Sequence, residues 1–251
     1  MIPTPDLAAL KPFLPDVYDP AEDTFLLLDA LEGDADALRT RHAPSPSPAA
    51  AETPTPLKAS TAPLVTTPFI VEIGPGSGCV LAFLAALVGC NAVYWGVDMN
   101  PKACAATRAV AAANRVRHSD VVMGDLTAAM AARLCGQVDV LVFNPPYVPT
   151  DDEELAAAAP AGAADSGPVG IAAAWAGGVA GRVVIDRLMP QVKALLSPRG
   201  AFYLVVVREN RPDELARLAR EQWGLRPRML MERKAGYEGL GVMKFEHVSD
   251  E

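Results

Sequence analysis

Three acidic residues stand where strands of a predicted sheet end: Glu72, Asp98 and Asp125. Glu72 leads into the turn Gly74-Pro75-Gly76-Ser77-Gly78, which connects a strand to a helix and is called the glycine turn below. Because glycine has no Cβ, a ligand can lie directly against this backbone. Asp98 comes 20 residues after Gly78, where a carboxylate can accept both hydroxyls of a ribose. These residue types predict a nucleoside-bearing ligand.

The spacing argues against ligands that carry phosphate. A dinucleotide fingerprint needs G-x-G-x-x-G, but Cys79 occupies the third glycine position and Gly78 comes one residue early. The glycine turn also lacks the Lys-Ser/Thr pair of a P-loop, and the three strand-end loops offer no Lys or Arg to neutralise a phosphate. We therefore expect a nucleoside with a positive charge and no phosphate, with Asp125 near its purine edge.

The elements that position these residues alternate between strand and helix patterns. Strand patterns occupy 69–73, 92–98, 120–124, 138–143, 201–207, 228–233 and 241–248, with helical patterns between most of them. This alternation predicts an α/β fold with right-handed crossovers and a doubly wound, mostly parallel sheet of seven strands. Only seven residues, 234–240, join the last two strands, so that pair should be antiparallel.

Composition fits one globular protein. The chain has 251 residues, of which 51% are hydrophobic and 21% charged, and its net charge is −8. Its longest apolar stretch, 79–89, is shorter than the ~18–20 residues that span a bilayer, and the N-terminus lacks a signal-peptide pattern. We expect a cytoplasmic or nuclear location and no membrane contact. Four dispersed cysteines (Cys79, Cys90, Cys104, Cys135) and three histidines (His42, His118, His247) predict no metal site.

The glycine turn, the ribose-binding Asp98 and the antiparallel last strand together resemble the class I S-adenosylmethionine-dependent methyltransferases. The fourth strand ends in Asn144-Pro145-Pro146-Tyr147, the NPPY motif. It is similar to the motif of members that methylate a planar nitrogen in adenine, cytosine or a glutamine amide. Such a nitrogen is a poor nucleophile because its lone pair is delocalised. Hydrogen bonds from its NH2 protons to the Asn144 side-chain oxygen and the Pro145 carbonyl would fix it, while two prolines keep the loop rigid and Tyr147 stacks on it.

Four further segments resemble one family, the eukaryotic release-factor glutamine methyltransferases related to bacterial HemK. They are 17–28, 142–150, 173–182 and 195–205. The resemblance implies S-adenosylmethionine as cofactor and N5-methylation of the glutamine in the Gly-Gly-Gln loop of the eukaryotic class 1 translation termination factor. It also implies a small zinc-binding activator subunit as an obligate partner. A human relative has been linked to histone lysine methylation as well.

Carried over by position, the resemblance assigns a set of site residues. The cofactor contacts are Tyr18, Thr24, Glu72, Gly74, Gly76, Gly78, Asp98, Asp125, Leu126 and Asn144, and the substrate motif is Asn144, Pro145, Pro146 and Tyr147. The segment around Tyr18 predicts a helix with Asp19 as N-cap, Pro20 in its first position and Glu22 completing a capping box. We expect this helix to cover the methionine end of the cofactor.

Two segments depart from a compact domain. Seven of the 23 prolines lie between Pro44 and Pro68, so we expect an N-terminal extension (1–38), a flexible insertion (39–67) and a methyltransferase domain (68–251). The loop 151–167 comes directly after the segment of the NPPY motif and borders the expected substrate entrance. The sequence therefore does not determine substrate access or specificity. The strand at 120–124 should lie at a sheet edge, where a partner strand can pair with it.

Three other functions remain open from the sequence. The NPPY motif permits an adenine-N6 methyltransferase, but 20 of the 30 acidic residues precede residue 182, and nucleic-acid binding depends on cations at the phosphates. Lysine methylation needs a group that removes a proton, and the motif offers no obvious base. A cofactor-binding scaffold would have no use for the NPPY acceptors. We therefore favour a protein glutamine as acceptor.

Overall fold

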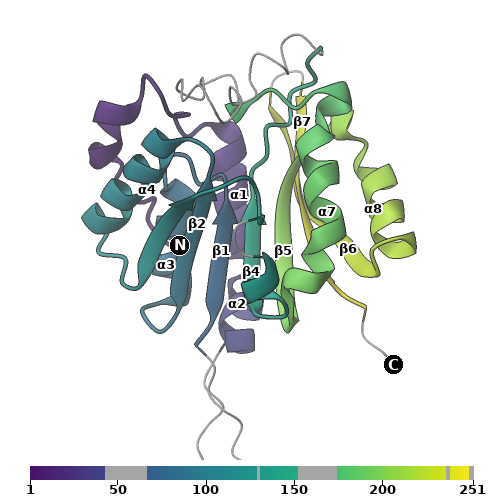
Figure 1. Ribbon diagram of the computed structural model, residues 1–251, viewed down its shortest axis with the longest axis horizontal. Coiled ribbons are helices and arrows are strands. Elements are labelled where there is room, and N and C mark those ends of the chain that lie inside the picture. Colours follow the sequence, from purple (N-terminus) through teal and green to yellow (C-terminus); the bar gives the residue numbers. More distant parts are fainter. Residues whose placement is uncertain (43–66, 129–130, 152–173, 236–237, 249–251) are drawn as a thin grey trace, which may run out of the picture.

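The computed structural model describes residues 1–42, 67–128, 131–151, 174–235 and 238–248. Within these residues, seven strands form one sheet in the order β3-β2-β1-β4-β5-β7-β6 (Figure 1). The strands are β1 (Phe69–Ile73), β2 (Val93–Asp98), β3 (Ser119–Met123), β4 (Val138–Phe143), β5 (Leu196–Val207), β6 (Leu225–Ala235) and β7 (Glu238–His247). Neighbours among β1 to β5 are parallel, whereas β7 runs antiparallel to both β5 and β6. The predicted fold class is confirmed.

The strand order reverses at β1, which pairs with β2 on one side and β4 on the other. A ligand crevice forms at such a switch point, outside the carboxyl ends of the strands. Ile73 of β1 is in register with both Val97 and Phe143. The residues that follow these three positions, which include the glycine turn, Asp98 and Asn144, therefore meet at one edge of the sheet.

Helices cover both faces of the sheet (Figure 1). α1 (Glu22–Gly33), α2 (Ala35–His42) and α3 (Cys79–Val88) share one apolar layer with inward residues such as Ile70 and Val140. The alternate residues Val71 and Leu141 share the other layer with α7 (Val183–Leu195) and α8 (Pro212–Glu221). α4 (Pro101–Ala113) packs against β2, β3 and η1 (Ala8–Phe13), and the short helix α5 spans Ala131–Leu134. This period-two alternation on parallel strands is what buries both faces.

The predicted start of the N-terminal helix is wrong. α1 begins at Glu22 with Ala21 as N-cap, so Asp19 and Pro20 precede the helix and no capping side chain is used. The Asp23 carboxylate serves the first turn instead, because its Oδ1 accepts from the Thr24 backbone N–H at 2.7 Å. α1 is also buried over most of its circumference, Leu26 and Leu27 included. It packs between α3 and the β6–β7 hairpin.

Parts of the predicted domain division lie outside the described residues. α2 runs on to His42, four residues beyond the boundary expected at 38. Residues 43–66 of the predicted insertion and 152–167 of the predicted loop are not among the described residues. Within the described part of the chain, no helix is both long and apolar enough to span a membrane.

Candidate active site

A cavity of about 340 Å³ opens at the carboxyl edge of β1, β2 and β4. Ten of the predicted site residues line it: Tyr18, Thr24, Glu72, Gly74, Gly76, Asp98, Leu126, Asn144, Pro145 and Pro146. Its volume lies within the ~300–1,000 Å³ range of small-molecule sites. Gly78, Asp125 and Tyr147 do not line the cavity, and each takes another role that is described below.

The glycine turn holds three left-handed residues, with φ of +61° at Gly74, +50° at Gly76 and +77° at Gly78. Gly78 is the N-cap of α3, and a Cβ on it would lie 2.8 Å from the Thr107 Cα of α4. The third glycine therefore permits close helix packing and does not contact the cavity. Thr107 Oγ1 donates to the Gly76 carbonyl at 3.0 Å, which ties the turn to α4.

The Asp98 carboxylate is held by two backbone N–H groups, one from the glycine turn and one from the residue that caps α4. Its Oδ2 accepts from the Gly76 N–H at 3.1 Å, and its Oδ1 accepts from the Asn100 N–H at 2.9 Å. Burial raises the pKa of Asp98, while these backbone hydrogen bonds lower it in part. Each oxygen keeps a second lone pair, so the carboxylate can accept both hydroxyls of a ribose.

Glu72 is the most strongly perturbed acid of the cavity. Its side chain is 3% exposed, and its Oε2 has no hydrogen-bond partner among the described residues. Burial raises the pKa of Glu72 to about 8, against hydrogen bonding from the Leu81 backbone, and the neighbouring Asp98 raises it further. A cationic ligand would favour the charged forms of both acids. The cavity therefore suits a positively charged nucleoside, as the sequence predicts.

Asp125 follows β3 just outside the cavity, between the lining residues Gly124 and Leu126. Its Oδ2 forms an ion pair with Arg187 of α7, while its buried Oδ1 has no partner among the described residues. Arg187 itself lines the cavity. The strand-end loops carry no cation, as the sequence indicates, but a helix distant in the chain supplies one beside Asp125.

Asp23 organises the NPPY motif, a contact that sequence reasoning missed. Its Oδ2 accepts from Asn144 Nδ2 at 2.9 Å and from the Tyr147 hydroxyl at 3.1 Å. Its Oδ1 accepts from the Thr24 N–H and, at 3.4 Å, from the Tyr18 hydroxyl. The position of Asp23 at the start of the predicted helix is the available signal, but it indicates helix capping or a cover over the cofactor and not a contact with the NPPY motif.

The contact with Asp23 determines which way Asn144 faces. A carboxylate oxygen accepts hydrogen bonds, so the amide nitrogen of Asn144 turns toward Asp23 and the amide oxygen turns away. That Oδ1 is buried and has no hydrogen-bond partner among the described residues. Buried acceptors are normally satisfied. Asn144 thus presents an unused acceptor in the wall of the cavity, where the NH2 group of a planar amide or amine can satisfy it.

Sequence comparisons place the chain among known methyltransferases, although no family model matches it. It is 44% identical over 230 residues to mouse "Methyltransferase HEMK2", covering 92% of this chain and 89% of that protein. It is 36% identical over 241 residues to the fission yeast (Schizosaccharomyces pombe) "eRF1 methyltransferase catalytic subunit mtq2", covering 94% and 91%. The chain belongs to the HEMK2/mtq2 methyltransferase family. The predicted family membership is confirmed.

A solved structure of this family agrees with the fold. The chain superimposes on a chain of the E. cuniculi Mtq2–Trm112 complex with a TM-score of 0.55, at 28% identity, covering 93% of this chain and 99% of that one. The complex is described as responsible for methylation of the eRF1 translation termination factor. As a member of the HEMK2/mtq2 family, the chain is a class I methyltransferase that uses S-adenosylmethionine.

The residues at the cavity fit this cofactor. S-adenosylmethionine supplies a methyl group activated by a sulfonium. Asp98 would hold its ribose, and Gly74 and Gly76 would lie against it; Glu72, which lines the same cavity and has an unpartnered oxygen, would favour its positive charge. No group of three or more metal-ligating side chains occurs among the described residues. His118 is exposed, and the His247 ring lies 3.3 Å from the Leu196 carbonyl at the far end of β5.

Proposed function

We propose that this protein transfers a methyl group to the N5 nitrogen of the glutamine in the Gly-Gly-Gln loop of the eukaryotic class 1 translation termination factor. The observation that carries the proposal is the buried, unpartnered Oδ1 of Asn144, a residue of the cavity lining whose amide nitrogen donates to Asp23. A glutamine amide offers the planar NH2 group that such an acceptor binds. The relatives named for eRF1 methylation support this choice of substrate.

Catalysis rests on positioning. Asn144 Oδ1 and the Pro145 carbonyl would each accept a hydrogen bond from one N–H of the amide, which places the nitrogen lone pair toward the methyl donor. Once it carries the methyl group, the nitrogen loses one of its protons to solvent. Holding two reactants in this way can supply ~7–11 kcal/mol of the barrier at best. Asp23 is not available as a general base, because its two oxygens already accept from Asn144, Tyr147, Tyr18 and Thr24. This arrangement favours an acceptor that needs no prior deprotonation.

Lysine is therefore the weaker alternative. A lysine ammonium must lose a proton before it can attack, and no unoccupied base stands beside Asn144 among the described residues lining the cavity. Glu72, whose pKa is about 8, lines the same cavity but lies on β1 among the cofactor-binding residues. A histone peptide with labelled cofactor provides the direct test.

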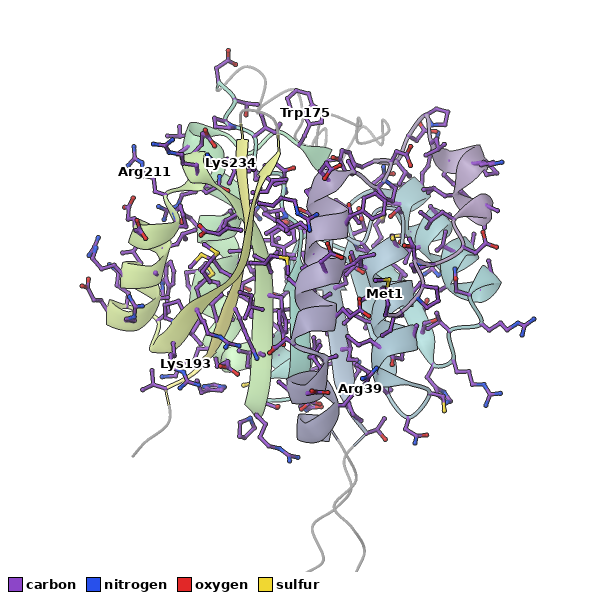
Figure 2. The ribbon with its side chains drawn as sticks, turned by 180° about the vertical axis from the view of Figure 1, so that it is seen from behind. Met1, Arg39, Trp175, Lys193, Arg211 and Lys234 are labelled. Carbon is purple, nitrogen blue, oxygen red and sulfur yellow. The ribbon has the colours of Figure 1, made fainter. Side chains whose placement is uncertain are left out.

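Adenine is the other acceptor that the NPPY motif permits. Arg211 and Lys234 lie at the carboxyl edge of the sheet, on the same side as Trp175 (Figure 2). Phosphate contacts dominate nucleic-acid affinity, and 20 of the 30 acidic residues precede residue 182, which disfavours a nucleic acid as acceptor. Incubation with duplex DNA and with the termination factor in parallel separates the two functions, since labelled adenine would refute the glutamine proposal.

We further propose that a small zinc-binding activator subunit pairs with β3. This strand is the edge of the sheet next to β2, and Met123 at its end is 67% exposed. Arg108 of α4 donates to Asp120 and to the Val121 carbonyl, so a partner strand would share that carbonyl or displace Arg108 from it. An unpaired edge accepts a partner strand. The Mtq2–Trm112 complex supports a partner of this kind.

The deciding experiment is co-expression with a Trm112-type partner, followed by mass spectrometry of the Gly-Gly-Gln peptide of the termination factor. Addition of one methyl group to the glutamine is the expected result. An unmodified glutamine, with the partner bound and the cofactor present, would contradict the proposal and favour a scaffolding role. Because the termination factor acts in translation, the proposal includes a cytoplasmic location, with the nucleus as the alternative.

A further inference from the structure

The segment 174–182 contains two glycines whose backbone lies close against that of the NPPY motif. A Cβ on Gly181 would lie 1.8 Å from the Tyr147 carbonyl oxygen, and one on Gly177 would lie 2.5 Å from the Pro146 carbonyl oxygen. No other residue type fits at these distances. The signature A-G-G-x-x-G-R at 176–182 is thus explained by close backbone contact with the motif.

Asn210 completes this contact from the end of β5. Its side chain is fully buried, and its Nδ2 donates to the carbonyls of Tyr147 (3.1 Å), Ala180 (3.0 Å) and Gly181 (3.2 Å). Its Oδ1 accepts from the Val207 N–H at 2.8 Å. The Val207 N–H needs an acceptor, and the three carbonyls need a donor. An asparagine amide supplies both, with its oxygen toward Val207 and its nitrogen toward the carbonyls.

The backbone on either side of this contact is strained. Ala180 and Arg211 both adopt left-handed conformations, with φ of +54° and +53°. Left-handed backbone at a residue other than glycine is retained where the surrounding structure imposes it, often at functional sites. The segment is further fixed to the sheet edge, because the Val148 N–H donates to the Trp175 carbonyl and the Gly177 N–H donates to the Val148 carbonyl.

We propose that Asn210, together with Gly177 and Gly181, is a positioning device for methyl transfer. We call these three residues the carbonyl clamp. The clamp holds the backbone of Pro146 and Tyr147, while Asp23 holds the side chains of Asn144 and Tyr147. It thereby sets where the Asn144 and Pro145 acceptors meet the substrate amide. The inference rests on the proposed function.

The clamp is separate from the cofactor-binding residues. Gly177, Gly181 and Asn210 do not line the cavity, whereas the cofactor contacts other than Asn144 come from the N-terminal segment and from the ends of β1, β2 and β3. Loss of the clamp should therefore lower kcat and leave the affinity for S-adenosylmethionine unchanged. A displacement of about 1 Å in a positioning group can lower a rate by roughly 100-fold.

The test compares Asn210→Ala with a matched control at another buried polar side chain. Ser197 lies at the opposite end of β5, is 8% exposed, and donates to Asp139 Oδ1 at 2.7 Å. Both Asn210→Ala and Ser197→Ala should lower Tm by a few degrees, since each leaves a buried polar group unpaired. Only Asn210→Ala should lower kcat on the termination factor, by roughly 30- to 100-fold. Should Asn210→Ala fail to fold, Asn210→Ser is tested in its place. Because serine keeps one donor, we expect its kcat to lie between those of the wild type and a clamp-free enzyme.

A readout that needs no substrate separates failure of the clamp from failure of the proposed function. The chain has five tyrosines, so fluorotyrosine labelling gives few 19F resonances, and Tyr147→Phe identifies that of Tyr147. Asn210→Ala should shift this resonance, and Ser197→Ala should not. If the wild type methylates the factor and Asn210→Ala keeps kcat within about twofold, the clamp is overturned. If the wild type methylates no glutamine, an unshifted Tyr147 resonance overturns the clamp and a shifted one supports it.

Discussion

Two buried polar clusters at opposite ends of α1 differ in how completely their groups are paired. At the N-terminal end, Asn144 Oδ1 and Glu72 Oε2 lack partners among the described residues. At the C-terminal end, Asp34 accepts from the Tyr203 hydroxyl at 2.7 Å and forms ion pairs with Lys244 and Arg228. Lys244, 1% exposed, also lies 3.3 Å from Glu246. The groups at the C-terminal end are paired within the fold, whereas the two unpartnered acceptors at the N-terminal end can accept hydrogen bonds from ligands.

The two ends of α1 should therefore contribute to different properties, the N-terminal end to activity and the C-terminal end to stability. An unpartnered buried acceptor destabilises a fold by about 1–3 kcal/mol, so its retention at Asn144 points to a role in binding. Removal of one partner from a paired buried ion is strongly destabilising, because it leaves a buried charge without compensation. Substitutions in the two clusters should therefore affect different measurements, and the predictions below run from the largest effect to the smallest.

Asn144→Ala should lower methyl transfer to the termination factor by roughly 10³-fold, because it removes the acceptor that holds the reacting nitrogen. S-adenosylmethionine affinity, measured by calorimetry, should change by less than about fivefold. Asn114→Ala is the matched control, since Asn114 bonds only with the backbone and Asp6 at the far end of α4. Full transfer by Asn144→Ala would remove the basis of the proposed mechanism.

Asp34→Asn should lower the free energy of unfolding by about 2–4 kcal/mol, because Lys244 loses the charged partner nearest to it in a buried site. The kcat of the folded fraction should stay within about twofold. Urea unfolding and single-turnover assays on the same preparation measure the two quantities. A large loss of kcat without a loss of stability would reverse the roles assigned to the two clusters.

Asp23→Asn, the same substitution at the other end of α1, should have the opposite profile. An amide offers one acceptor oxygen in place of two, so Asn144 and Tyr147 lose a shared anchor. We expect kcat to fall by roughly 10²-fold while the free energy of unfolding changes by no more than about 1–2 kcal/mol. Equal kcat for Asp23→Asn and Asp34→Asn would contradict the assignment of activity to the Asp23 cluster and stability to the Asp34 cluster.

Glu72→Gln should change the pH dependence of stability. The folded protein keeps this proton up to a pKa of about 8, whereas the unfolded chain loses it near the ordinary value of 4.5. Between these values wild-type stability falls as pH rises, by up to about 1.4 kcal/mol per pH unit from this group. Glu72→Gln should flatten that slope in cofactor-free protein between pH 6 and 7. Parallel slopes for both proteins would show that Glu72 does not hold the proton.

Some of the site was predictable because it depends on residues close together in the chain. The glycine turn, the strand ending at Asp98 and the NPPY motif each carry a local pattern, and the parallel strand order brings them to one edge. Predictions from local patterns were wrong where one residue type is compatible with two structural roles. Asp19 has the side chain of an N-cap, but the helix begins at Glu22, and Gly78 has a ligand-binding position but serves helix packing.

The sequence alone determined the fold class, the cofactor-binding strand ends and the planar-nitrogen motif, because hydrophobic periodicity and turn chemistry act over a few residues. Only the tertiary structure decided how that motif is held. Asp23 lies 121 residues from Asn144, and Asn210 lies 63 residues from Tyr147. No local pattern specifies which buried polar groups meet across such separations. Those pairings follow from the requirement that a closed, packed core satisfies its donors and acceptors, and they are fixed only when the whole sheet has assembled.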